Sequence, residues 1–137
     1  MKDMYKMKTT PICHKEAVVK GDFYRFTVLT SRLIRMEYSK NGEFEDRATQ
    51  TVINRCFDVP KYSVSDQDGV LKIKTDFIEI RYLKGEFNKN SLSAKFIGDF
   101  EGRGFSWVYG QEVRGNLKGT ARTLDGVNGE CDLGRCV

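Results

Sequence analysis

The chain has 137 residues, a length that fits one domain built around a single hydrophobic core. Hydrophobic residues account for 39% of the sequence and aromatic residues for 12%, a composition that argues against intrinsic disorder. The 23 lysines and arginines are scattered among 19 acidic residues, so the net charge of +4 forms no basic stripe for a nucleic acid.

Residues 1–21 are predicted to form a leader that carries the first edge strand. The opening lacks the apolar stretch of a secretion signal, and no run of the chain reaches the roughly 20 apolar residues that span a bilayer. We therefore expect a cytoplasmic protein with neither a membrane nor a nucleic acid as partner.

Two adjacent strands are predicted at the start of the main domain, which we expect to occupy residues 22–137. Apolar residues alternate with polar ones in segments 22–29 and 32–38. This alternation places three apolar side chains of each segment on one face: Tyr24, Phe26 and Val28, then Ile34, Met36 and Tyr38. The charged stretch 43–58 is predicted to be a long excursion.

Further short strands follow at intervals of about ten residues. A hairpin is predicted at 62–74, around a turn at Asp68-Gly69. More candidate strands lie at 78–82, 92–97 and 105–109. No window keeps the three- and four-residue apolar spacing of a helix, so the sequence predicts an all-β sandwich or barrel. The residues expected to be largely buried are Tyr24, Phe26, Val28, Ile34, Met36, Ile73, Ile78 and Ile80.

The part of the chain after Gly98 is rich in glycine and loses the strand periodicity. Such a segment predicts loops at a functional rim, or strands whose partners lie outside the chain. We expect the sandwich to be incomplete at its C-terminus.

The cysteines and the single histidine predict no metal site and no disulfide. Cys13, Cys56, Cys131 and Cys136 lack the paired spacing of a zinc site, and free thiols fit a chain without an export signal. His14 is expected to be an exposed loop residue. The acidic residues of the 43–46 stretch could serve glycosidase-type acid and base chemistry, but neighbouring acids in a charged loop are more often simply solvated.

Trp107 and Tyr109 are predicted to lie on one face of a short strand. Aromatic rings stack on the apolar face of a sugar, and they equally serve as core residues of a sandwich. Both interpretations stay open. The following stretch, 116–125, is rich in hydroxyl, amide and carboxylate groups suited to hydrogen bonding with a polyol.

Five blocks of the sequence, in order, resemble the N-terminal domain of glycoside hydrolase family 31. They lie at 25–38, 44–55, 90–92, 107–110 and 116–126, and together they span most of residues 22–130. The resemblance implies a β-sandwich related to galactose mutarotase, placed ahead of a catalytic (β/α)8 barrel in α-glucosidases, α-xylosidases and their relatives. It also implies that the chain ends before that barrel.

The resemblance further implies that this chain alone has no catalytic residues and needs no cofactor. In the family both catalytic aspartates lie on the barrel, one of them in an Asp-Met-Asn type motif that this chain lacks. The family role of the domain is to pack on the barrel of the same polypeptide and to send a loop over the mouth of the carbohydrate pocket. The 116–126 stretch is the candidate loop, with Thr120, Arg122 and Asp125 as substrate contacts.

Two other interpretations remain. The chain could be a free-standing carbohydrate-binding module that uses Trp107, Tyr109 and the polar loop, or a purely structural interaction domain. If it is a domain separated from its barrel, its packing surface faces water, and we expect the isolated chain to associate with itself.

Overall fold

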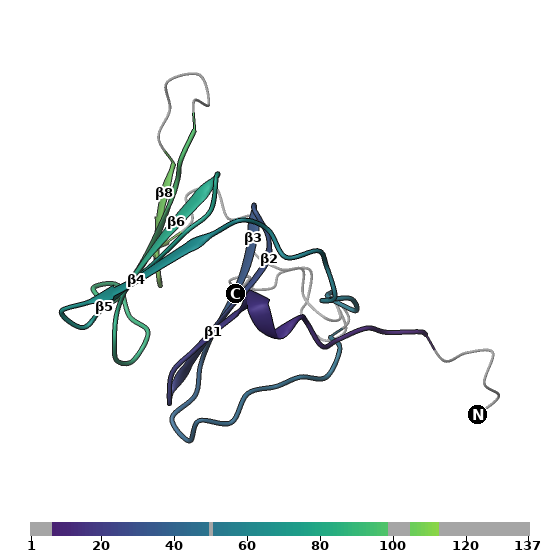
Figure 1. Ribbon diagram of the computed structural model, residues 1–137. Helices are drawn as coiled ribbons and strands as arrows, with labels where there is room; N and C mark the ends of the chain where they lie inside the picture. Colours follow the sequence, from purple (N-terminus) through teal and green to yellow (C-terminus); the bar gives the residue numbers. More distant parts are fainter. Residues whose placement is uncertain (1–6, 50, 99–104, 113–137) are drawn as a thin grey trace, which may run out of the picture.

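A computed structural model describes residues 7–49, 51–98 and 105–112 of the chain. Within these ranges the protein is all-β, apart from a single turn of 3-10 helix (Figure 1). The elements are η2 (Lys15–Ala17), β1 (Val18–Lys20), β2 (Tyr24–Thr30), β3 (Leu33–Tyr38), β4 (Ser63–Gln67), β5 (Val70–Lys74), β6 (Ile78–Leu83), β7 (Leu92–Phe96) and β8 (Ser106–Val108). The all-β fold class predicted from the alternation is confirmed.

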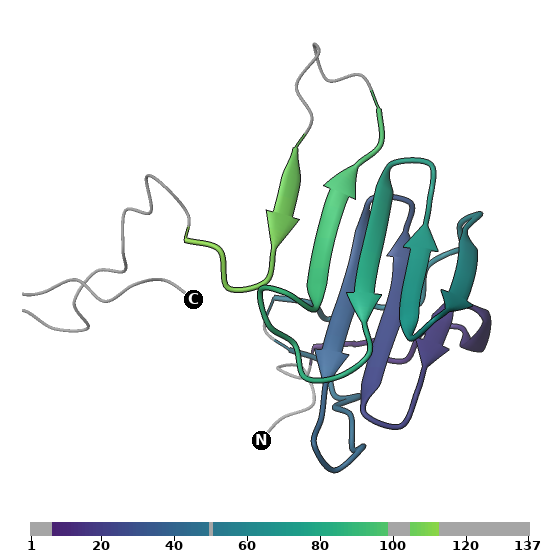
Figure 2. The ribbon, with the colours of Figure 1, turned by 90° about the vertical axis from the view of Figure 1, so that its left-hand side faces the viewer.

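The strands form two antiparallel sheets that pack face to face in a sandwich-like arrangement. The smaller sheet has the order β1-β2-β3 and the larger one the order β4-β5-β6-β7-β8. Figure 2 shows the larger sheet in front of the smaller one, with the light green strand β8 lying beyond the edge of the strands behind it. The two sheets are therefore unequal in the described ranges, and β8 extends past the edge of the smaller sheet.

The core consists of apolar side chains from the facing sides of the two sheets, because successive residues of a strand point to opposite faces. Seven of these residues are at most 2% exposed: Phe26, Val28, Leu71, Ile73, Ile80, Tyr82 and Leu92. The rings of Phe26 and Tyr82, one from each sheet, lie 5.4 Å apart. Contacts of this kind hold the sheets together.

Eight residues were predicted to be largely buried: four of them are fully buried and the other four only partly. Phe26, Val28, Ile73 and Ile80 are buried, whereas Tyr24, Ile34, Met36 and Ile78 are only half-buried and pack around the core. Ile34 and Met36 belong to the edge strand β3, which pairs with β2 alone among the strands that the structure describes. Alternation assigns a residue to a face, but the neighbouring strands decide how deeply it is buried.

The turn between β4 and β5 is the one that the sequence predicts. Asp68 and Gly69 have φ angles of 52° and 75°, which is the left-handed region that both central residues of a type I′ turn occupy. The turn joins two strands paired from Gln67 and Val70 outward. The predicted hairpin is confirmed.

The excursion between β3 and β4 returns against the N-terminal segment. Thr10 forms a parallel bridge with Asn54, and the backbone N–H of Arg55 donates to the carbonyl oxygen of Thr10 at 2.7 Å. On the outer face of the smaller sheet, Thr27 and Leu29 are only 2% and 3% exposed. The outer face of the smaller sheet is therefore also shielded from water at these two positions.

Candidate functional site

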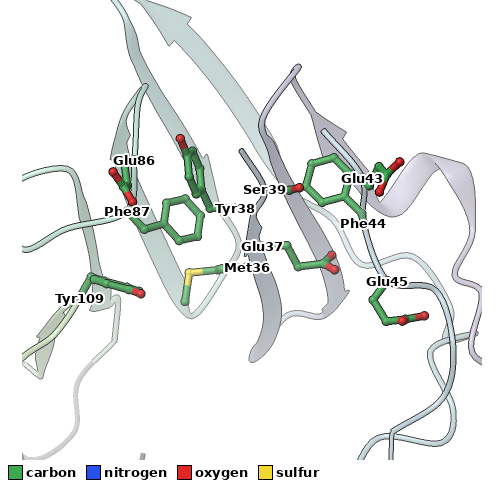
Figure 3. A pocket seen from close by; sticks show the side chains of 10 residues that line it. All are labelled: Met36, Glu37, Tyr38, Ser39, Glu43, Phe44, Glu45, Glu86, Phe87 and Tyr109. Atoms are coloured by element: carbon green, nitrogen blue, oxygen red, sulfur yellow. The ribbon is translucent and has the colours of Figure 1, made fainter. Parts of the chain in front are cut away.

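An open groove of about 500 Å³ follows the free edge of β3 (Figure 3). Its floor is the second half of β3 and the residue after it, and loops from both sides form its walls. The lining residues are Met36, Glu37, Tyr38, Ser39, Glu43, Phe44, Glu45, Glu86, Phe87 and Tyr109. Figure 3 shows Phe87 and Tyr109 on one side of β3 and Phe44 with Glu45 on the other.

The wall on the outer face is held by an ion-pair network centred on Glu37. The guanidinium of Arg25 donates to both carboxylate oxygens of Glu37, at 2.7 and 2.9 Å, and to Asp46 at 2.6 Å. Arg35 lies 2.7 Å from the same Glu37 carboxylate and donates to the carbonyl oxygen of Glu45 at 2.8 Å. Two strands and the following loop are thereby fixed to one another.

The pKa values of the two arginines are shifted in opposite directions. The hydrogen bonds to Glu37 raise the pKa of Arg25, whereas burial lowers the pKa of Arg35. Both arginines remain charged at any ordinary pH because their unperturbed values are so high. The negative charge of Glu37 is therefore already matched from within the domain.

The other carboxylates of the groove have partners that lie outside its lining. Glu86 pairs with the exposed Lys40 at 3.2 Å, and Glu45 pairs with Arg47 at 2.6 Å. Hydrogen bonds from Arg47 lower the pKa of Glu45 to about 2. Among the described residues that line the groove there are four glutamates and no lysine or arginine, but cations just outside the lining pair with Glu37, Glu45 and Glu86, and Glu43 accepts a hydrogen bond from the neutral amide of Asn41.

The inner wall is aromatic. The Phe87 ring lies 5.6 Å from Tyr38 and 5.8 Å from Tyr109, and the Tyr109 ring lies 6.2 Å from Trp107. Rings and carboxylates side by side can bind the apolar face and the hydroxyl groups of a sugar. They can also hold a cationic or an extended polypeptide ligand.

Trp107 and Tyr109 share one face of β8 and its continuation, as the alternation predicted. Trp107 lies opposite Ala94 of β7, so both rings are on the side of the larger sheet that faces the core. They are nevertheless 37% and 41% exposed. The described strands of the smaller sheet do not extend over them, so the two rings lie on the core-facing side of the larger sheet without being buried in the core.

The inner face of β7 and β8, which no described strand of the smaller sheet covers, is apolar beyond these two rings. Phe96 and Phe105 are 47% and 55% exposed, and an apolar hollow of about 130 Å³ lies among them and their neighbours. We refer to Phe96, Phe105, Trp107 and Tyr109 as the overhang. Its four side chains are of the types that normally fill a sandwich core.

Thr120, Arg122 and Asp125, predicted to contact substrate, lie outside the described residues, as do Cys131 and Cys136. Cys13 and Cys56 are free thiols. The described part of the chain contains no cluster of three or more metal-ligating side chains. None of the helices in the described ranges is long and apolar enough to cross a membrane.

His14 is exposed, as expected, but it has a partner that the sequence did not indicate. Its Nε2 lies 3.5 Å from the Sγ atom of Cys56, which is 42 positions away. Sequence reasoning also missed Glu86 and Phe87, the groove residues between β6 and β7. Only the packing of the two sheets against each other brings them opposite β3.

No protein-family model matches the chain, and a search of the curated proteins finds no match to it. The fold and the groove define an all-β domain of the sandwich type with glutamates and aromatic rings along one edge.

Proposed function

We propose that the chain is the N-terminal β-sandwich domain of a retaining α-glycosidase of glycoside hydrolase family 31, with a galactose mutarotase-like fold. In this proposal the domain packs on a catalytic (β/α)8 barrel of the same polypeptide and contributes the 116–126 loop to the rim of the substrate pocket. The ordered sequence blocks of residues 22–130 are its first support.

The structural observation that supports the proposal best is the overhang. Four aromatic side chains on the inner face of β7 and β8 are 37% to 55% exposed. Monomeric soluble proteins rarely expose a large contiguous apolar patch of this kind. Covering them with further chain would remove apolar surface from water, at roughly 25 cal/mol for each Å² buried. The overhang is therefore the side on which the rest of the protein is expected.

The proposal is tested by comparing two proteins: residues 1–137, and the same chain extended through the downstream reading frame. Both would be assayed with p-nitrophenyl α-glucoside and p-nitrophenyl α-xyloside. We expect hydrolysis only by the extended protein, with retention of anomeric configuration. Hydrolysis by residues 1–137, or an extension that encodes no barrel with two catalytic aspartates, would reject the proposal.

The second candidate is a free-standing carbohydrate-binding module. It is favoured by the groove, where Tyr109 and Phe87 lie near carboxylates that can accept hydrogen bonds from sugar hydroxyls. Maltose and isomaltose titrations, followed by the fluorescence of Trp107, separate the two candidates. A saturable response at about 1 mM sugar or below supports the module, and no response supports the separated domain.

A cytoplasmic location belongs to the same proposal. Its support is that Cys13 and Cys56 are both unpaired thiols, a state that a reducing compartment maintains.

A further inference from the structure

The backbone along the floor of the groove has hydrogen-bonding groups that point away from the domain. The N–H of Ser39 donates to the carbonyl oxygen of Phe23 at 2.9 Å, which makes these two residues a hydrogen-bonded pair of the β2–β3 ladder. Hydrogen-bonded pairs alternate with non-hydrogen-bonded pairs along antiparallel strands. The backbone N–H and C=O groups of Glu37 and Arg35 therefore also point toward β2. The N–H and C=O groups of Ile34, Met36 and Tyr38 then point to the other side.

On that other side, the described part of the chain places no strand, because β3 is the last strand of its sheet. Natural sheets usually blunt such an edge with a bulge, a proline or an inward-pointing charge. The sequence of β3 contains no proline, its only irregularity with β2 lies at the far end near Thr30, and its core-facing residues are apolar. Within the described ranges, the half of β3 that lines the groove is thus an edge without these protective features.

The two walls define what an added strand would contact. Its side chains would alternate between the inner wall, made by Phe87 and Tyr109, and the outer wall, made by Phe44 and Glu45 (Figure 3). The inner wall is aromatic and continuous with the overhang, and the exposed Glu86 lies beside it (Figure 3). The outer wall carries cations as well as carboxylates: Lys20 and Arg25 lie 5.1 and 5.0 Å from the Phe44 ring, and Glu45 pairs with Arg47. The exposed Glu43 accepts a hydrogen bond from the neutral amide of Asn41. A strand with apolar residues at every second position fits the aromatic wall, and lysine or arginine between them can reach the exposed carboxylates of Glu43 and Glu86.

We propose that the groove binds an extended segment of a partner protein, which adds to the edge of β3 as a further strand and carries alternating apolar and basic residues. Main-chain hydrogen bonds to Ile34, Met36 and Tyr38 supply one part of the affinity, and the aromatic wall and acidic residues supply the side-chain selectivity. The inference is independent of the glycosidase proposal, since it depends only on the edge, the walls and their charge.

The probe is a synthetic peptide with acetylated and amidated ends and the sequence Lys-Val-Arg-Tyr-Lys-Val-Arg. A second peptide has the same side chains but is N-methylated at every residue, so that its backbone cannot donate hydrogen bonds. A third has glutamate in place of each lysine and arginine. Binding to the full chain is measured by calorimetry, and amide hydrogen exchange is followed by NMR.

We expect the first peptide to bind and the other two to bind at least about tenfold more weakly. The exchange data contain their own control within β3. In the free chain the amides of Arg35 and Glu37 are protected by β2, and those of Ile34, Met36 and Tyr38 exchange rapidly. In the complex this second set gains protection.

The charge of the groove is tested with the double variant Glu43→Lys and Glu86→Lys, both at exposed positions. The matched control is Asp58→Lys with Asp76→Lys, which changes the net charge equally at exposed positions that do not line the groove. We expect the groove variant to weaken binding of the basic peptide about tenfold, and the control to leave it within about twofold.

Three results would overturn the inference. The first is the absence of saturable binding at about 1 mM peptide. The second is binding without new protection at Ile34, Met36 and Tyr38. The third is protection of these amides in the free chain that rises with protein concentration, which would make a second copy of the chain the occupant of the groove.

Discussion

Arg25 and Glu37 lie directly opposite each other on β2 and β3, and the guanidinium of Arg25 donates two hydrogen bonds, of 2.7 and 2.9 Å, to the carboxylate of Glu37. Both side chains are largely shielded from water, at 12% and 14% exposure, and Arg35 shares the same carboxylate. One negative charge thus separates two positive ones on the outer face of the smaller sheet.

Replacing this carboxylate by an amide should destabilise the protein. In Glu37→Gln the guanidinium groups of Arg25 and Arg35 lose their shared counter-charge, and we expect the free energy of unfolding to fall by about 2 kcal/mol. Urea denaturation measures it. The control is Glu79→Gln, which breaks a more exposed pair with Lys95 and should cost less than about 1 kcal/mol. Equal losses in the two variants would contradict the role given to Glu37.

Arg55 presents the opposite case, a buried arginine without an ionic partner among the described residues. It is 3% exposed, its Nε atom has no hydrogen-bond acceptor, and one Nη group reaches the carbonyl oxygen of Pro11 at 3.4 Å. We expect Arg55→Met to leave the free energy of unfolding unchanged or to raise it by up to about 2 kcal/mol, because an unpaired buried polar group is costly. Thermal and urea unfolding check this. A loss of more than about 1 kcal/mol would show that Arg55 has a stabilising partner.

Two tyrosines predict how stability changes at alkaline pH. Burial raises the pKa of Tyr82 and of Tyr62 above the ordinary tyrosine value. When a tyrosine pKa is higher in the folded state, the unfolded chain loses that proton first as the pH rises. The contribution of these tyrosines to the free energy of unfolding is therefore constant below about pH 10 and falls above it. Urea midpoints measured at a series of pH values should show this decline, and it should be shallower in Tyr82→Phe. An equally steep decline in the variant would assign it to other groups.

The overhang predicts self-association of the isolated chain. We expect Phe96→Thr with Phe105→Thr to lower hydrophobic-dye binding at least about twofold and to reduce association in analytical ultracentrifugation, because both changes remove exposed apolar surface. Leu83→Thr is the control, since Leu83 is 43% exposed but lies outside the overhang. A chain that is monomeric at every concentration and binds no dye would argue against an unfilled packing surface.

The predictions from sequence held best where local chemistry decides the structure. The Asp68-Gly69 turn forms because both residues tolerate positive φ, and the strands of the core appear where apolar residues alternate. The face shared by Trp107 and Tyr109 follows from the same period of two. These features need no knowledge of what lies across the sheet.

The candidate groove could not be predicted in the same way, because its residues come from four separate parts of the chain. Met36 lies on β3, Phe44 in the excursion, Phe87 between β6 and β7, and Tyr109 after β8. The contact between Cys56 and His14 has the same origin, in a parallel bridge between distant segments. No local pattern encodes which segments meet.

The sequence by itself determined the fold class, the hairpin and the faces of the strands, since each depends on the alternation or turn preference of a few consecutive residues. Only the tertiary structure decided the depth of burial: Phe26 is fully buried and Met36 half-buried, although they lie opposite each other on the same inner face. The physical reason is that, in the part of the chain that the structure describes, β2 has a strand on both sides and β3 has a strand on one side. The same inequality between three and five strands leaves Trp107 exposed and opens the groove beside β3.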